Sequence, residues 1–384
     1  MRPTALKLTA GFLLFCGLSS AIKAQVQPIN VVTTAVPFLR ISPDARSGGM
    51  GELGVATSAD QYAGLWNIGK VAFNDSRGGI GATYTPWLKD LVNDVYLASL
   101  AGYFKFDENQ AIHGSLRYFS LGNITFTDNL GNDFGSFRPR EFGVDVGYSR
   151  KLNAKHGVGI TLKYINSNLA GGTTVGSTTY KAGSAVAADL GWYYKGTKGW
   201  SWGAVLSNLG SKISYTDNAD AKDFIPANLG FGTNYTKKFN EQNQISFGLE
   251  LNKLLVPTPP AEGDVAGLAA YRSKGIVSSW FSSFGDAPDG FAEELKEFQI
   301  SVGAEYWYND QFALRAGYFY ENKTKGDRRY FTAGLGVKYN IFGFNFAYLL
   351  PQGSGVSRNP LANTLRFSVL FDFGNGGEKM KADK

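Results

Sequence analysis

From Gly78 almost to its end, the sequence consists of short segments in which apolar residues alternate with polar or small ones. Because successive side chains of a strand point to opposite faces, each segment has one apolar and one polar face. About fourteen such segments of roughly 8–13 residues follow one another, and no stretch reaches the roughly 20 apolar residues of a membrane helix. The pattern predicts an all-β fold, a transmembrane outer-membrane β-barrel of about 14 antiparallel strands.

The connectors between these segments are alternately tight and long. The predicted strands lie near 78–86, 94–106, 110–121, 140–150, 156–166, 184–194, 200–209, 226–236, 244–252, 298–307, 311–320, 329–339, 342–350 and 364–373. Bacterial barrels have short periplasmic turns and longer outer loops, so this alternation supports the membrane interpretation. An even number of strands also predicts that both termini lie in the periplasm.

The first residues have the features of a cleaved signal peptide. Arg2 and Lys7 precede or begin an apolar run, and Ile22-Lys23-Ala24 suits a signal peptidase. Cys16 is the only cysteine and lies inside this segment, so the exported chain is expected to have no thiol for disulfides, catalysis or metal binding. Loss of three cationic residues lowers the net charge from +6 to +3, which is too weak and dispersed to indicate nucleic-acid binding.

The chain therefore divides into four predicted parts. The N-terminal segment after the signal peptide shows no sustained alternation and contains several prolines and glycines, so we expect it to plug the barrel or to cap its periplasmic mouth. The charged tail after the last strand is expected to project into the periplasm. The predicted boundaries are 1–24 for the signal peptide, 25–77 for the N-terminal plug or cap, 78–373 for the barrel and 374–384 for the tail.

No motif indicates an enzyme. The two histidines, His113 and His156, lack partners at the spacing that a metal site or an acid–base pair needs. Residues 49–54 match the string G-x-G-x-x-G, but the preceding residues do not form the buried strand that a dinucleotide site requires. We interpret these glycines as positions of tight packing and predict no catalytic residues, no cofactor and no metal.

Charged residues of both signs fall on the polar faces of the predicted strands. Five basic and six acidic groups in one confined lumen are expected to pair, whereas a ring of one sign would indicate an ion-selective pore. We therefore favour a filled, structural lumen over a conduction path. The predicted lumenal charges are Arg117, Glu141, Asp145, Lys163, Asp189, Glu250, Glu305, Arg315, Lys338, Arg366 and Asp372.

The connector at 253–297 is the longest in the chain and is rich in aromatic residues. Long loops in compact domains are often functional, and exposed aromatic side chains indicate contact with something. Either the loop folds back over its own barrel mouth, or it is a docking surface for a protein partner. The connector after the first strand raises the same question. The candidate partner-binding residues are Trp87, Leu88, Trp280, Phe281, Phe284 and Phe291.

The N-terminal segment contains the run Ala35-Val36-Pro37-Phe38-Leu39-Arg40-Ile41-Ser42-Pro43-Asp44-Ala45-Arg46-Ser47-Gly48-Gly49-Met50-Gly51. This run resembles the N-terminal signature of the PorV family, also called LptO, of the type IX secretion system of Bacteroidetes. Trp66-Asn67, Tyr84-Thr85-Pro86-Trp87-Leu88 and Leu91-Val92-Asn93-Asp94 extend the match. The resemblance covers essentially the whole mature chain, but beyond residue 106 it is mainly one of pattern.

The resemblance implies a fourteen-stranded barrel similar to the FadL-type fatty-acid channels and a non-catalytic role. PorV-like proteins receive cargo that carries a C-terminal domain at the SprA/Sov-type translocon. They then pass it to a PorU-type sortase, which attaches the cargo to lipopolysaccharide at the surface of the outer membrane. The alternative is a FadL-like outer-membrane transporter of hydrophobic small molecules, for which the lumenal charges leave no long apolar path.

Overall fold

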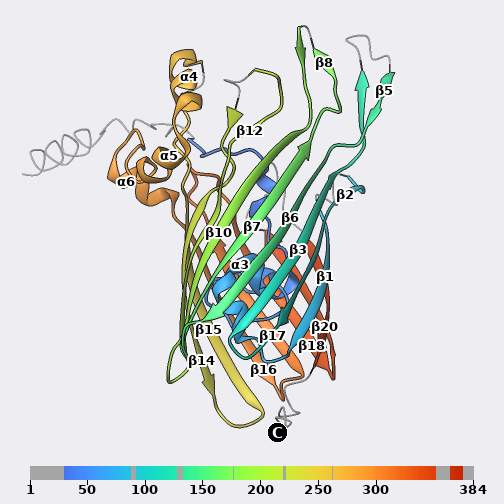
Figure 1. Cartoon of the computed structure of the whole chain (residues 1–384), viewed down its shortest axis with the longest axis vertical. Helices are drawn as coiled ribbons and strands as arrows, with labels where there is room; N and C mark the ends of the chain where they lie inside the picture. The colour runs from blue at the N-terminus through green and yellow to red at the C-terminus, as the bar shows by residue number, and fades with distance from the viewer. Residues whose placement is uncertain are drawn as a thin grey trace, which may run out of the picture.

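The structure, a computed structural model, describes residues 30–87, 92–127, 133–175, 177–218, 222–261, 263–351 and 364–374. Fourteen antiparallel strands of these residues form a closed barrel, in the order in which they occur along the chain (Figure 1). Its wall is closed by β1 and β20, with Gly78 opposite Phe373. The wall strands are β1 Gly78–Pro86, β2 Val95–Lys105, β3 Gln110–Leu121, β6 Arg140–Lys151, β7 His156–Asn168, β10 Gly183–Lys195, β11 Trp200–Gly210, β14 Asn228–Lys238, β15 Asn243–Leu254, β16 Gln299–Tyr308, β17 Phe312–Tyr320, β18 Arg329–Tyr339, β19 Phe342–Pro351 and β20 Leu365–Phe373. The predicted fold class is confirmed.

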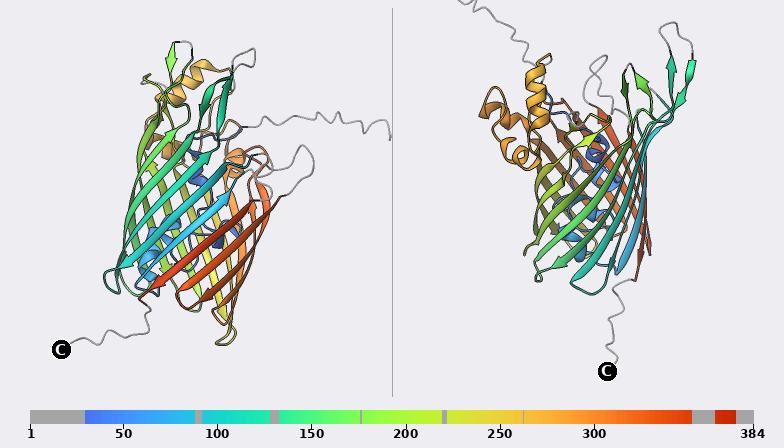
Figure 2. Two further views of the ribbon diagram at one scale, coloured as in Figure 1. Left: turned by 90° about the vertical axis from the view of Figure 1, so that its right-hand side faces the viewer. Right: turned by 45° about the horizontal axis from the view of Figure 1, so that its top comes forward.

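The two mouths of the barrel differ. At one mouth, which we call the turn end, short turns join the strands. At the other, the loop end, longer connections carry ribbons and short helices, and Figures 1 and 2 show the helices gathered to one side of the mouth. None of the helices in the described ranges is long and apolar enough to cross a membrane. The loop-end elements are β4 Ile124–Thr127, β5 Asp133–Phe137, β8 Thr174–Val175, β9 Thr178–Thr179, β12 Ile213–Ser214, β13 Lys222–Asp223, α4 Val265–Ser273, α5 Ile276–Ser282, α6 Phe291–Glu294 and η3 Leu295–Glu297.

The outer surface of the wall is apolar, and its inner surface is polar. On β7, for example, Leu162 is 64% exposed, whereas its neighbours Thr161 and Lys163 are buried. The same alternation runs along β3, β6 and β18. Apolar side chains that are exposed on the isolated chain and arranged in a belt around a barrel are the surface that lipid covers.

The N-terminal segment lies inside the barrel and forms a plug that runs from one mouth to the other. The backbone N–H of Asn30 donates to the carbonyl of Thr324 at the loop end, and that of Arg77 donates to Gly374 at the turn end. The sequence left a plug and a cap open for this segment, and its described part lies inside the lumen, packed against the wall strands. The short helices of the plug are η1 Pro37–Arg40, α2 Ala45–Gly48, α3 Ala63–Trp66 and η2 Ile68–Phe73.

The path of the plug determines at which mouth the described residues begin. The described residues start at the loop end and finish at the turn end. The prediction that both termini lie in the periplasm stays a prediction, because residues 1–29 and 375–384 lie outside the described ranges. The even strand number does bring Gly78 and Phe373 together, but the plug crosses the lumen before the first strand. The predicted signal peptide 1–24 and residues 375–384 of the predicted tail lie outside the described ranges.

Glycines let the plug backbone approach the wall closely. Gly51 has a φ of +69° and lies against the backbone of Tyr318, where a Cβ atom would be 2.7 Å from the nearest wall atoms. On the facing strand, a Cβ atom at Gly317 would be 2.1 Å from the backbone nitrogen of Gly51. The G-x-G-x-x-G string thus occupies positions of tight packing, because only glycine tolerates both the backbone conformation and the approach.

Candidate functional site

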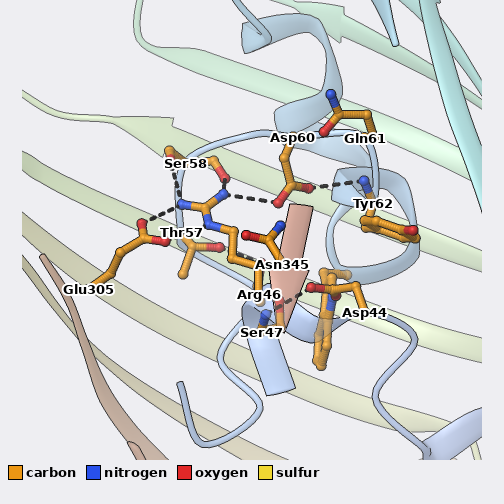
Figure 3. Close-up of polar contacts among 12 residues, drawn as sticks. Asp44, Arg46, Ser47, Thr57, Ser58, Asp60, Gln61, Tyr62, Glu305 and Asn345 are labelled. Carbon is orange, nitrogen blue, oxygen red and sulfur yellow. Dashed lines mark hydrogen bonds and ion pairs between the residues drawn. The ribbon is translucent and has the colours of Figure 1, made fainter. Parts of the chain in front are cut away.

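Arg46 in α2 is the centre of the polar contacts between plug and wall (Figure 3). Its guanidinium donates through Nε and Nη2 to the two carboxylate oxygens of Glu305, at 2.9 and 2.8 Å. It also donates to Asp60 at 3.0 Å and to Ser58. Glu305 in turn accepts from Arg315 at 2.7 Å. Two arginines and two carboxylates therefore balance, and such bidentate arrangements are among the strongest hydrogen-bonded pairs.

Three further lumenal charges hold the plug. Glu250 accepts the backbone N–H groups of Gly54 and Val55 at 2.9 and 2.8 Å. Arg366 donates to Glu52 at 3.1 Å. Arg117 donates to the carbonyl of Leu39 at 3.1 Å. Wall charges thus satisfy polar groups of a segment that has little regular secondary structure of its own.

Other lumenal charges pair within the wall. Lys163 lies 2.6 Å from Asp189, where the register between β10 and β11 shifts. Lys338 lies 2.9 Å from Asp372. Of the two remaining carboxylates, Glu141 accepts from the hydroxyl of Ser167 at 2.7 Å, and Asp145 lies 3.4 Å from Nε2 of His113. Of the eleven predicted lumenal charges, the structure buries all except Lys338, which lies near the turn end.

Sequence reasoning missed the plug's own share of this network. Arg46, Glu52 and Lys70 are buried, and Lys70 donates to the carbonyl of Gly54 and to Thr57 rather than to a carboxylate. The available signal is that charged residues occur in a segment without alternation, which the sequence places inside the barrel or over its periplasmic mouth. Their partners depend on strand register and could not be assigned.

The aromatic outer loop is anchored by a second network of charges at the loop end. Lys253, at the end of β15, donates to Glu294 at 3.1 Å and to Glu297 at 2.6 Å. Lys325, between β17 and β18, donates to Glu293 and, at 3.0 Å, to Glu297. We call these five residues the loop lock. It fixes α6 and η3 against the rim of the barrel.

Beyond the loop lock, aromatic side chains face away from the protein. Phe281 and Phe291 are each 75% exposed and Phe284 is 45% exposed, whereas Trp280 is half-buried. Trp87 behaves differently, because it packs edge-on against Phe119 and lines the mouth of the barrel. Leu88 lies outside the described residues. The structure therefore separates the candidate residues into an exposed aromatic loop, comprising Phe281, Phe284 and Phe291, and a lining residue at the mouth.

The loop lock should open in acid. Burial raises the pKa of Glu293, but the bonds from Lys325 outweigh burial and hold this pKa below its usual range. A lowered folded-state pKa gives stability that is present above the ordinary value of about 4.3 and is lost as the pH falls through the lowered value. After correction for intrinsic rates, hydrogen exchange of residues 291–297 should therefore be slow at pH 7 and accelerate below about pH 4.

The variant Lys325→Met tests the same lock at neutral pH. It leaves buried carboxylates without a partner, so exchange of residues 291–297 should be at least about tenfold faster at pH 7. The control is Lys323→Met, since Lys323 is exposed in the same connection. Equal exchange rates in the two variants would mean that the ion pairs do not hold the loop.

The described residues include possible metal ligands and the linings of cavities. No group of three or more histidine, aspartate, glutamate or cysteine side chains among them could hold a metal ion. One cavity of about 110 Å³ lies between plug and wall and is lined by plug residues such as Trp66 and by wall residues such as Arg117 and Glu250. Because its lining mixes charged and apolar groups, this cavity is better suited to bound water than to a long apolar ligand.

Two solved toluene transporters have the same architecture. TodX of P. putida matches with a TM-score of 0.53 and 13% identity, covering 87% of this chain and 98% of that chain. TbuX of Ralstonia pickettii matches with a TM-score of 0.51 and 13% identity, with the same coverage. At this level of identity the likeness concerns the fold. The chain is accordingly a plugged, fourteen-stranded β-barrel of the outer-membrane type.

The particular family follows from the sequence. The family model described as type IX secretion system protein PorV matches residues 23–261, which is more than half of the chain. The chain belongs to the PorV family, as the resemblance of its N-terminal segment indicated, and is a component of the type IX secretion machinery. Among curated proteins, no sequence matches it significantly.

Proposed function

We propose that this barrel is a non-catalytic carrier of the type IX secretion system, which binds the C-terminal domain of secreted cargo at the translocon and passes it to the attachment complex at the cell surface. The observation that carries the proposal is the family match over residues 23–261. The plugged lumen supports it, because a carrier that works through its outer surface needs no open channel. The exposed aromatic loop supplies a surface of the kind that protein interfaces bury.

The proposal includes an orientation. The turn end faces the periplasm and the loop end faces outward, as in other bacterial barrels. Phe281 and Phe291 then lie on the outer side, within reach of a partner in or above the membrane. Asn30 also lies on the outer side, whereas Gly374 lies at the periplasmic mouth and the tail continues from there. The expected partners are a SprA/Sov-type translocon, a PorU-type sortase and cargo with type IX C-terminal domains.

The second candidate is transport of hydrophobic small molecules. The observation that favours it is the likeness in fold to two barrels described as toluene transporters. The lumen argues against it, because the plug fills the barrel from mouth to mouth and buries charged groups such as Arg46, Glu250 and Arg366 along the way. A hydrophobic solute would have to pass these charges or displace the whole plug.

The experiment is recovery of the tagged protein from native outer membranes after mild cross-linking, followed by identification of what is attached. A carrier should bring down a large translocon barrel and exported proteins that retain their C-terminal domains. Recovery of the barrel alone would contradict the proposal. The second measurement is solute uptake by liposomes that contain the purified protein. A transporter would accelerate uptake of toluene or a fatty acid, and a plugged carrier would not.

A further inference from the structure

A cavity of about 240 Å³ lies at the loop end, between the start of the plug and strands β1, β3 and β18. Its walls are aromatic: Phe38 from the plug, Trp87 after β1, Phe119 from β3 and Tyr330 from β18. Its charged lining residues are Arg40, Arg328 and Glu52. We call this the mouth pocket. Its aromatic walls belong neither to the contacts of Arg46 nor to the exposed aromatic loop.

The walls of the mouth pocket are held firmly. Phe38, Phe119 and Tyr330 are buried, with at most 6% of each exposed. Trp87 contacts Phe119 edge to face, with ring centroids 6.4 Å apart. Tyr330 stacks on Phe319 at 5.1 Å with an interplanar angle of 12°. Such packing forms a preorganised apolar site, because these rings lose little freedom when a ligand enters.

The charges at the pocket are unbalanced. Arg328 donates to both carboxylate oxygens of Glu321, at 2.8 and 3.0 Å, and Arg40 donates to the same carboxylate at 3.4 Å. Glu52 also lines the cavity, and it accepts from Arg366 at 3.1 Å. Counting both carboxylates and all three arginines, the cluster carries a net charge of +1. Burial and the neighbouring Arg328 lower the pKa of Arg40 to about 10, so Arg40 remains protonated at neutral pH. A further carboxylate from a ligand would offset this excess charge, since arginine binds carboxylates through two parallel hydrogen bonds.

We propose that the mouth pocket binds the C-terminal residue of an exported polypeptide, with an apolar side chain between the aromatic walls and the terminal carboxylate at Arg40 and Arg328. The inference rests on the proposed role as a carrier of secreted proteins. It names a specific contact for the cargo, deeper in the barrel mouth than the exposed aromatic loop. Capture of a terminal carboxylate is a recurrent way of recognising a chain end.

The size of the pocket favours a chain end over a lipid acid. Pockets for drug-sized ligands have about 300–1,000 Å³, and the mouth pocket has about 240 Å³. That volume suits one large side chain. A long-chain fatty acid carries the same combination of carboxylate and apolar group, so it is the competing source of this chemistry and is tested directly.

The experiment measures peptide binding to the full-length protein in lipid nanodiscs. The probe is a fluorescently labelled, flexible glycine–serine peptide that ends in phenylalanine with a free carboxylate. The matched probes are the same peptide with a C-terminal amide and the same peptide ending in serine. Fluorescence anisotropy should show binding of the free acid, with at least about tenfold weaker binding of the amide and of the serine peptide.

Variants of the protein locate the site. Arg328→Gln should weaken binding of the free acid at least about tenfold and leave binding of the amide unchanged. The matched control is Arg329→Gln, because Arg329 is adjacent in sequence but pairs with Asp327 at 2.8 Å and does not line the cavity. This control should bind the free acid as the unaltered protein does. Arg40→Gln provides a second test if the first variant folds poorly.

The outcomes separate this inference from the proposed function. Equal affinity for acid and amide, or no binding of either, would overturn the mouth pocket as a site for chain ends, while cross-linked recovery of the secretion machinery would still stand. Binding of palmitate that is lost in Arg328→Gln, without binding of the peptide, would assign the pocket to lipid acids and also overturn the inference. Peptide binding in a protein that recovers no machinery would leave the pocket in place and contradict the carrier role.

Discussion

Replacing Arg46 with alanine is expected to reduce the free energy of unfolding by about 3–5 kcal/mol, the cost of leaving a buried charge without its partner. Glu305 and Asp60 would lose their bonds to the guanidinium, and the balanced group of two arginines and two carboxylates would become net negative. The measurement is urea unfolding of the purified barrel in detergent, followed by tryptophan fluorescence. Among the described residues of the plug, Arg46 makes the most contacts with charged side chains.

The controls separate charge from geometry. Arg46→Lys retains the charge but not the fork that binds Glu305 through two bonds, so it should lose an intermediate amount of stability. Arg138→Ala removes an exposed arginine between β5 and β6 and should stay within about 0.5 kcal/mol of the unaltered protein. If Arg46→Ala matched Arg138→Ala, the network would contribute no net stability. If the alanine variant did not fold, the lysine variant would still give a graded result.

The double variant Phe281→Asp/Phe291→Asp is expected to abolish most recovery of secretion partners without weakening the barrel. Both rings are 75% exposed, so their loss should change stability by no more than about 0.5 kcal/mol. Aromatic residues at the centre of an interface often contribute about 2 kcal/mol or more each. Cross-linked recovery of the translocon or of cargo should therefore fall at least about tenfold.

A matched change at the opposite mouth tests whether position matters. Phe239 is 59% exposed in the turn between β14 and β15, so Phe239→Asp adds the same kind of charge at a comparable exposed ring. Partner recovery should be unaffected by this change. Equal loss in both proteins would point to a general effect of added charge, and no loss in either would remove the aromatic loop from the proposed interface.

Strand positions could be predicted from the sequence because a membrane barrel repeats one physical rule. Lipid on one side and a polar lumen on the other impose alternation on every strand, so β1, β3 and β18 have the bounds that alternation predicts. No comparable pattern is imposed on the sequence of the plug. Its short helices are set by contacts with the wall, such as that of Asp44, which caps α2 while also accepting from Trp66.

The same reasoning explains which parts of the functional surface could not be predicted from the sequence. Composition identified the long loop and its aromatic residues, and Phe281 and Phe291 are exposed. Whether Trp87 faces outward or inward depended on its packing against Phe119, a residue about thirty positions away, so sequence could not decide it. The mouth pocket depends on bringing Arg40 of the plug beside Arg328, almost 290 residues later, and no local pattern signals that meeting.

The last strand of the wall is bound to the plug at three lumen-facing positions. Ser368 accepts from the backbone of Ala45 at 2.9 Å, Asp372 accepts from Gln61 at 2.7 Å, and Arg366 donates to Glu52. On its other edge, the same strand makes the seam with β1. Because the same strand holds both the plug and the seam, we expect closure of the barrel and ordering of residues 45–61 to depend on each other. A substitution that removes the plug contacts of this strand should therefore also weaken its pairing with β1.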